Sequence, residues 1–221
     1  MRAGRRPVVI GGDHAVAIPS VSAAASYLRH EQGPTAALGL IWVDAHADLE
    51  TPETSGSGNI HGMAAAALLG YGAEALCTLA GFRPKLHPQN LVYIGLRDTG
   101  FAERALIRAH SIPTFTASDI EKLGIATVCE RAFALMAHNT AGFVVSFDMD
   151  VCDPLEAPGI QAPERGGLRF REARIIMEYA AAAEKLMALE LVEVNPGLDR
   201  DFATVKAAIA LIEVALGATI I

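Results

Sequence analysis

Residues 38–48 read LGLIWVDAHAD, and this stretch decides the fold that we expect. Residues 38–43 carry no polar side chain, which predicts a strand covered on both faces, because a half-exposed strand would alternate polar with apolar side chains. The stretch then changes to acids and a histidine at every second position, in Asp44, His46 and Asp48. Such an ending is typical of a parallel sheet that binds its ligand at the carboxyl ends of the strands.

Short apolar runs like this one recur along the chain and alternate with longer amphipathic segments. The runs predict strands at residues 7–10, 38–43, 91–95, 114–116, 142–147 and 189–194. The longer segments predict helices at residues 16–30, 61–69, 101–109, 170–185 and 202–216. Ser118 and Glu121 form a capping box that predicts one more helix, running towards His138. The alternation predicts an α/β fold with three αβα layers and a mostly parallel sheet, and we expect residues 1–221 to form a single domain.

The composition argues against several classes of protein. The chain has 18 Lys and Arg residues against 25 Asp and Glu residues and no basic cluster, so we expect no nucleic-acid partner. No apolar run reaches the roughly 18 residues that span a membrane, and the nearest, residues 207–221, is interrupted by Glu213. The apolar run near the N-terminus, residues 8–10, is too short for a secretory signal. The three cysteines contain no CxxC pair, so we expect a cytoplasmic protein with no membrane partner.

Four of the expected strands run into acids or histidine. These residues are His14, Asp44, His46, Asp48, Asp148, Asp150 and Glu193. Because the carboxyl ends of parallel strands meet at one edge of a sheet, we expect these side chains to lie together. Carboxylates gathered in this way repel one another, and a pair of divalent metal ions is the simplest means of holding them.

Two imidazoles and four carboxylates are the candidate ligands for such a pair: His14, His46, Asp44, Asp48, Asp148 and Asp150. Six side chains can serve two metals if two carboxylates bridge them. Oxygen ligands with some imidazole and no thiolate suit Mn(II). Two neighbouring metals can share a water, lower its pKa and direct a hydroxide at an electrophile, so the pattern predicts metal-assisted hydrolysis.

Each motif, taken alone, also fits a simpler structural role. The Gly-Gly-Asp-His segment at residues 11–14 could be a turn in which Asp13 caps a helix, and Asp-x-Asp at a strand end is a common turn. Three such motifs at successive strand ends are hard to account for as three separate turns. We therefore favour a metal site.

The chain resembles the ureohydrolase family, which includes arginases and agmatinases, from Gly11 to about Gly217. The resemblance rests on the segments GGDH at 11–14, DAHAD at 44–48, SGNIHG at 57–62, SFDMDVCDP at 146–154 and EVNP at 193–196. The third and the fifth of these segments are more similar to arginases than to agmatinases. The resemblance implies an arginase-like fold that lacks the usual N-terminal strands of the family.

The resemblance also implies a binuclear centre with two Mn(II) ions per chain. One ion would be held by His14, Asp44, Asp48 and Asp148. The other would be held by Asp44, His46, Asp148 and Asp150. Asp44 and Asp148 would then bridge the two ions, which agrees with the ligand count above.

Two residues match catalytic positions of the family, and a third, Asp48, has a role that follows from the chemistry. His61 matches the proton-shuttling histidine, and Glu193 matches the acid that holds the substrate guanidinium. Asp48 would deliver a proton to the leaving amine. The implied reaction is hydrolysis of a small guanidino compound by a metal-bridging hydroxide, in the first place L-arginine to L-ornithine and urea. The family further implies a homo-oligomer, a trimer or a hexamer.

Two substrate positions depart from the arginase pattern. Glu50 stands where arginases carry an asparagine that binds the α-carboxylate of the substrate, and Gly100 stands where they carry an aspartate that contacts the α-amino group. Ser57 and Asn59 are retained, and Glu103 could partly replace the lost aspartate. These departures keep agmatinase, or another guanidino-acid ureohydrolase, open as an alternative.

Only ten residues precede the Gly-Gly-Asp-His segment, where family members normally have further strands and helices. We therefore expect a shortened N-terminus or a misassigned start, and we expect residues 7–10 to form an exposed apolar edge strand. A shortened chain of this kind could also be a non-catalytic metal-binding paralogue, which is the alternative from another functional class.

Overall fold

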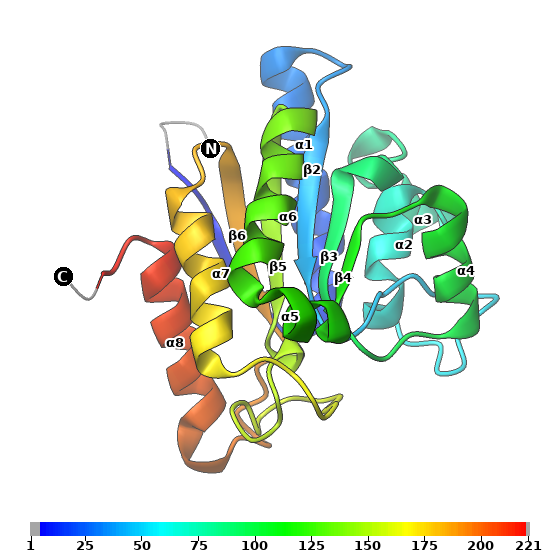
Figure 1. Cartoon of the computed structure of the whole chain (residues 1–221). Helices are drawn as coiled ribbons and strands as arrows, with labels where there is room; N and C mark the ends of the chain where they lie inside the picture. The colour runs from blue at the N-terminus through cyan, green and yellow to red at the C-terminus, as the bar shows by residue number, and fades with distance from the viewer. Residues whose placement is uncertain (1–4, 220–221) are drawn as a thin grey trace.

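Six strands form one sheet in which every neighbouring pair is parallel, as the computed structural model shows for residues 5–219 (Figure 1). The strand order is β1-β6-β5-β2-β3-β4. The strands are β1 (Val8–Ile10), β2 (Leu38–Val43), β3 (Leu91–Leu96), β4 (Thr114–Thr116), β5 (Gly142–Asp148) and β6 (Leu186–Val192). The predicted α/β fold is therefore confirmed.

Helices cover both faces of this sheet (Figure 1). They are α1 (Ala17–Gln32), α2 (Ala64–Leu69), α3 (Glu74–Cys77), α4 (Phe101–His110), α5 (Ala117–Leu123), α6 (Ile125–Asn139), α7 (Phe170–Ala182) and α8 (Ala203–Ala215). Alternate residues of a strand point to opposite faces. Leu40 and Trp42 accordingly pack with α1 and α2, whereas Ile41 and Val43 pack with α6, α7 and α8. The three predicted layers follow from these two apolar cores.

The predicted capping box at Ser118 is wrong. The N-cap is Thr116, whose hydroxyl accepts a hydrogen bond from the backbone N–H of Asp119, while the Asp119 carboxylate accepts one from the backbone N–H of Thr116. Thr116 ends β4 in an extended conformation, so it is the last residue that can cap the helix. The helix then stops at Leu123, because Gly124 adopts a positive φ of 79° and separates α5 from α6.

Two other boundaries differ from the prediction near the C-terminus. The strand expected at residues 189–194 begins three residues earlier, because its ladder with β5 runs from Leu186 opposite Phe143 to Val192 opposite Asp148. The helix expected at residues 170–185 ends correspondingly early, at Ala182. Glu193 leaves the strand with a φ of 59°. The strand therefore ends next to a residue predicted to bind substrate.

β1 lies at one edge of the described sheet and pairs with β6 alone. Ile10 is 67% exposed there, as expected for an apolar edge strand at residues 7–10. Among the described helices, none is long and apolar enough to cross a membrane.

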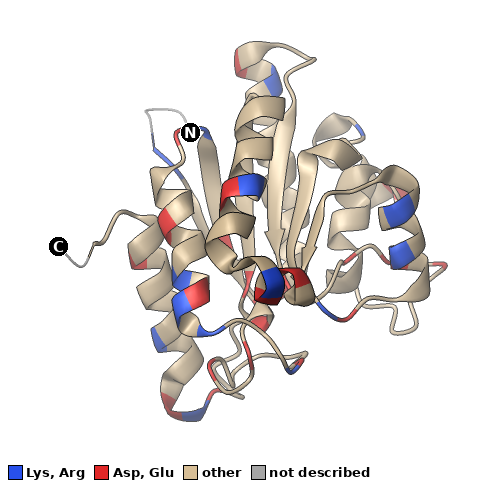
Figure 2. Cartoon of the chain, in the orientation of Figure 1, with Lys and Arg blue, Asp and Glu red and all other residues tan. Residues whose placement is uncertain are grey.

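Charged residues are nearly absent from the strands and occur mainly in the helices and loops (Figure 2). Asp148 and Glu190 are the two charged residues within the six strands. Polar residues gather instead just beyond the carboxyl ends of β2, β5 and β6. That edge of the sheet therefore positions the candidate site.

Candidate functional site

Two tight turns at neighbouring strand ends bring the acids together. Asp44 follows β2 and accepts a hydrogen bond from the backbone N–H of His46 at 2.6 Å. Asp148 ends β5 and accepts one from the backbone N–H of Asp150 at 2.7 Å, as the N-cap of a short 3-10 helix, Met149–Val151. Because β2 and β5 are adjacent, the two turns face each other.

The segment after β2 does not continue as a strand. Sequence alternation predicted that Asp44, His46 and Asp48 share one side of an extended chain, and the structure does bring the three residues to one site. The backbone, however, bends after Val43, and Asp48 has a positive φ of 50°. The neighbours were predicted correctly, but the conformation that joins them was not.

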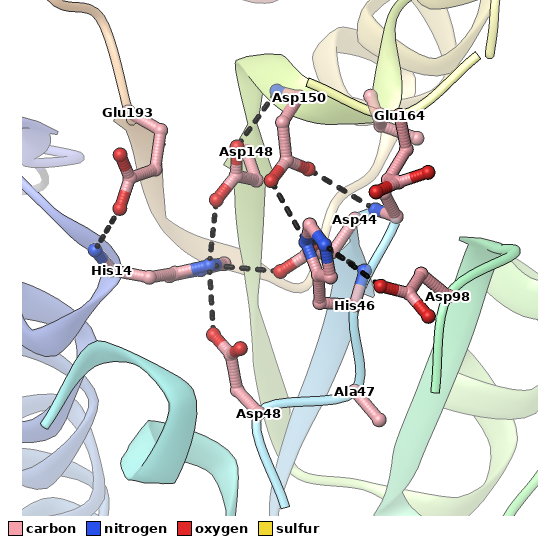
Figure 3. A network of polar contacts seen from close by, with 12 residues as sticks. His14, Asp44, His46, Ala47, Asp48, Asp98, Asp148, Asp150, Glu164 and Glu193 are labelled. Carbon is pink, nitrogen blue, oxygen red and sulfur yellow. Dashed lines mark hydrogen bonds and ion pairs between the residues drawn. The ribbon is translucent and has the colours of Figure 1, made fainter. Parts of the chain in front are cut away.

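His14 Nδ1 faces three carboxylates in the first group of candidate ligands. It lies 2.9 Å from Asp44 Oδ2, 3.0 Å from Asp148 Oδ2 and 3.3 Å from Asp48 Oδ2 (Figure 3). His14 starts a one-turn 3-10 helix, His14–Val16, and Asp13 caps this turn by accepting from the backbone N–H of Ala15. His14, Asp44 and Asp148 are placed so that one cation could bind all three.

The second group consists of Asp44, His46 and Asp150. His46 Nδ1 lies 2.9 Å from Asp150 Oδ2 and 3.5 Å from Asp44 Oδ1. Asp44 thus belongs to both groups, as expected for a bridging ligand. A third, outer group of His46, Asp98 and Glu164 lies beyond the second, where His46 Nε2 is 3.8 Å from Asp98 Oδ2 (Figure 3).

The burial and the donor atoms of the first two groups fit divalent cations. The four aspartates at the site, Asp44, Asp48, Asp148 and Asp150, are each less than 10% exposed. Burying carboxylates without positive charge is costly. His14 Nδ1 is fully buried and has no hydrogen-bond partner among the described residues, although three oxygens surround it. An imidazole nitrogen surrounded by carboxylate oxygens is well placed to bind a metal ion. The oxygen and imidazole donors match a hard cation such as Mn(II).

The pKa values of the aspartates and histidines also indicate that the site lacks positive charge. Burial raises the pKa of Asp48 and of Asp148 well above the usual range, and the neighbouring carboxylates add to this shift. Burial opposes the charged form of His46, but the carboxylates of Asp150 and Asp44 outweigh it and raise the pKa of His46 to about 12. For His14 burial is likewise outweighed, first by Asp44, and its pKa rises to about 9. Four carboxylates compete for two imidazoles.

A buried polar chain supports His14 from behind. His14 Nε2 lies 2.9 Å from Ser146 Oγ, whose hydroxyl donates to Glu190 Oε2 at 2.7 Å. With a cation bound at Nδ1, this arrangement would keep the proton on Nε2, where Ser146 Oγ can accept it. Trp42 stacks on the His14 ring at 3.9 Å and donates through Nε1 to Asp44 Oδ2 at 2.8 Å.

Sequence reasoning missed these supporting residues. The apolar run around Trp42 predicts only a core residue there, and no motif singles out Glu190. An acid in the middle of the apolar strand LMALELV was the available signal, because an acid is rarely buried without a partner.

A cavity of about 340 Å³ opens beside the two groups. Its lining includes the predicted residues His61, Glu193, Asp48, Glu50, Ser57 and Glu103. Glu193 Oε1 accepts a hydrogen bond from the backbone N–H of His14 at 3.2 Å and lies 3.7 Å from His61 Nδ1. Burial is the main cause of a raised pKa at Glu193. Seven carboxylates and no Lys or Arg line this cavity within the described chain.

Two of the predicted substrate residues are placed differently from the others. Glu103 reaches the cavity, but its carboxylate already accepts from the backbone N–H groups of Leu49, at 3.0 Å, and Gly100, at 2.6 Å. Asn59 lines an adjoining cavity of about 670 Å³, together with His61 and Glu193. The structure therefore brings six of the seven predicted catalytic or substrate residues to one cavity and Asn59 to its neighbour.

Comparison with known proteins places these features in a family. The profile of the arginase family matches residues 1–217. The arginase of Brevibacillus brevis is 44% identical over 217 residues, which cover 98% of this chain and 70% of that protein. The arginase of Bacillus caldovelox is 42% identical over 208 residues, which cover 94% of this chain and 67% of that protein.

Solved structures agree with this relationship. The structure of Bacillus caldovelox arginase superposes with a TM-score of 0.93 at 40% identity, covering 99% of this chain and 71% of that one. Arginase from Bacillus subtilis gives a TM-score of 0.92 at 40% identity, covering 98% of this chain and 74% of that one. The chain thus spans about 70% of the length of these relatives.

Proposed function

This chain belongs to the arginase family of ureohydrolases, and from that premise we propose that it hydrolyses the guanidinium group of a small substrate, in the first place L-arginine, to urea and an amine. The observation that carries the proposal is the meeting of the two candidate metal groups with Glu193 and His61 around one cavity.

The proposed centre holds two Mn(II) ions. His14, Asp44, Asp48 and Asp148 would hold one ion, and Asp44, His46, Asp148 and Asp150 the other. Two divalent cations supply Lewis acidity and activate water for attack at neutral pH. The bridging role of Asp44 is supported by its membership of both groups, and that of Asp148 remains a prediction.

We assign Glu193 to the substrate guanidinium. A carboxylate binds a planar guanidinium through paired charge-assisted hydrogen bonds. The backbone N–H of His14 fixes Glu193 Oε1, so the acid is held in place relative to the first metal group. Glu193 would therefore orient the guanidinium carbon towards the cations, and this positioning accounts for much of the rate gain that such a site can provide.

Proton transfer is assigned to Asp48 and His61. A guanidinium carbon that has been attacked by water must release an amine, and that nitrogen needs a proton. Asp48 lines the cavity and lies at the first metal group, so we assign to it the transfer to the leaving nitrogen. The His61 side chain is 30% exposed and near Glu193, which places it between the cavity and bulk water for proton exchange.

A second candidate substrate is favoured by the outer part of the cavity. Glu50, Asp98 and Gly100 line the cavity, and its lining within the described chain contains no Lys or Arg. A substrate that carries an α-carboxylate meets an acid at Glu50, whereas a guanidino amine such as agmatine does not. This lining supports a guanidino substrate without a carboxylate as the second candidate.

A urea-release assay tests the proposal. The Mn(II)-loaded chain is offered L-arginine, agmatine and guanidinobutyrate in turn, and Glu193→Gln serves as the matched variant. We expect urea from at least one substrate, loss of this activity on chelation, and a large decrease in the variant. A folded protein that binds manganese but releases urea from none of the three would instead be a non-catalytic metal-binding relative.

A further inference from the structure

Arg97 connects the two ligand-bearing turns of the site. It follows β3, next to the end of β2, and is partly buried. Its backbone N–H donates to the carbonyl of Ala45 at 2.9 Å, within the segment that carries Asp44 and His46. Its side chain reaches in the other direction, to the turn that carries Asp150.

The guanidinium is bound by backbone carbonyls rather than by an acid. Nη2 donates to the carbonyls of Asp150 at 2.7 Å and Glu164 at 2.9 Å, and Nη1 donates to that of Val151 at 3.1 Å. Longer contacts reach the carbonyls of Cys152 and Gly95. Arg97 forms no ion pair with any described residue, and its buried Nε has no hydrogen-bond partner. An arginine held in this way acts as a clamp on the main chain.

Through its side chain, Arg97 directly holds a ligand of one candidate metal group. Asp150 is the ligand whose own carbonyl Arg97 holds, and its carboxylate meets His46 Nδ1 and the backbone N–H of Ala45. The first group depends on other supports. Asp148 is fixed within β5, opposite Val192, and His14 is fixed by the Ser146–Glu190 chain.

We propose that Arg97 is a positioning residue that holds Asp150 in place for the cation bound by Asp44, His46 and Asp150, and that the cation bound by His14, Asp44 and Asp148 does not depend on it. This inference rests on the two-metal centre proposed above. Residues that hold a metal ligand from behind typically change metal affinity by about 10–100-fold when they are replaced. The effect is expected at one site only.

Manganese titration of the 221-residue chain tests the assignment, with free Mn(II) measured by electron paramagnetic resonance. The wild-type chain should bind two ions. Arg97→Met keeps the apolar stem but removes all five donors, and it should weaken one of the two sites about 10–100-fold while the other stays within about twofold. Arg97→Lys, with one compact ammonium group, should fall between Arg97→Met and the wild type.

Two comparison variants assign the affected site. Asp150→Asn should weaken the same site, and the double variant with Arg97→Met should lose little more than Asp150→Asn alone, because both changes act on one ligand. Arg174→Met is the matched control, since Arg174 pairs only with Glu178 on α7, and it should leave both sites unchanged.

Three results would overturn the proposal. Equal weakening of both sites in Arg97→Met would indicate a merely structural arginine, and unchanged binding at both sites would show that the clamp has no effect. Additive losses in the double variant would show that Arg97 acts elsewhere. If Arg97→Met fails to fold, the same criteria apply to Arg97→Lys. Fewer than two ions on the wild-type chain would instead refute the metal centre itself, so the two failures are distinguishable.

Discussion

His61 lines the cavity and its side chain is 30% exposed, as the proposed proton relay requires. Its Nδ1 lies 3.7 Å from Glu193 Oε1, and His61 begins the 3-10 helix His61–Met63 that precedes α2. His61→Ala should lower the rate of urea release by about 10²–10⁴-fold, the usual contribution of a positioned acid or base. Small imidazole buffers should restore part of the rate.

Metal content provides the control for His61→Ala. Because His61 belongs to neither metal group, the variant should retain the manganese content of the wild-type chain, measured by elemental analysis. Loss of metal from this variant would mean that His61 is a ligand and that the proton-relay assignment is wrong.

We expect Glu50 to weaken the binding of a substrate that carries a carboxylate. It lines the cavity, and its backbone N–H donates to the carbonyl of Gly62 at 3.0 Å. Two like charges about 4 Å apart repel by about 1 kcal/mol where water screens them, which corresponds to roughly a fivefold change in KM. Glu50→Asn should lower the KM for L-arginine by that factor and leave kcat nearly unchanged, because the contact lies away from the reacting carbon.

Steady-state kinetics on two substrates separate this effect from a general one. The KM for agmatine, which has no carboxylate, should stay the same or rise in Glu50→Asn. Glu53→Gln is the control, because Glu53 is an exposed acid of the same loop that does not line the cavity. An unchanged preference between arginine and agmatine would leave Glu50 without a role in specificity.

The sequence predicted the candidate metal ligands better than the residues that hold those ligands in place. Acids at every second position after apolar strands indicated Asp44, Asp148 and Asp150, because carboxylates rarely gather at one sheet edge without a cation to hold them. Trp42 and Arg97 carry no such pattern. Their contacts with the site depend on which strands become neighbours, and a single sequence does not contain that information.

At the scale of elements, β3 passes unusually close to both ligand turns. Gly95 has a φ of 104°, and a Cβ added there would lie 2.4 Å from Val151 Cγ2 and 3.1 Å from the Asp44 carbonyl. Gly95→Ala should therefore combine backbone strain, about 1–3 kcal/mol, with overpacking of a further 1–3 kcal/mol or so. We expect a lower free energy of unfolding and weaker manganese binding, measured by denaturant titration and metal titration.

Gly124→Ala is the matched control for that prediction. Gly124 also has a positive φ, 79°, but nothing lies within 4 Å of an added Cβ. The Gly124→Ala variant should lose only the unfolding free energy due to backbone strain, and its manganese binding should not change. If Gly95→Ala were no more destabilised than Gly124→Ala, close packing between β3 and the ligand turns would not matter for stability.

Element types were predictable, whereas several element ends were not. Continuous apolar runs identified the central strands, because the sheet is covered on both faces. The N-cap of α5 is ambiguous in the sequence, since Thr116 and Ser118 are each followed three residues later by an acid and only the end of β4 decides between them. The start of β6 is likewise set by its ladder with β5.

At the scale of the whole molecule, we propose that the chain folds as a single domain. The two apolar cores lie on opposite faces of one sheet, so neither can lose its packing without exposing the strands of the other. Thermal unfolding should therefore show one cooperative transition. Two separate transitions would contradict the single domain.

Manganese should stabilise the folded state in this transition, because the ligands come together only in the folded chain. At a free concentration 100 times its dissociation constant, one bound ion adds about 2.7 kcal/mol to the free energy of unfolding. Calorimetry with and without Mn(II) should show the melting temperature rising, and a chelator should reverse the rise. A melting temperature that changed with neither Mn(II) nor the chelator would argue against a metal centre in the folded protein.

The most direct test of the account is the rate of urea formation from L-arginine as manganese is added back to the chelated chain, with bound manganese per chain measured in the same samples. We predict that urea formation reaches its full rate only as the second ion binds, because both candidate groups border the cavity that contains Glu193 and His61. Full activity with one ion bound, or no urea from arginine or agmatine with two ions bound, would contradict a binuclear ureohydrolase.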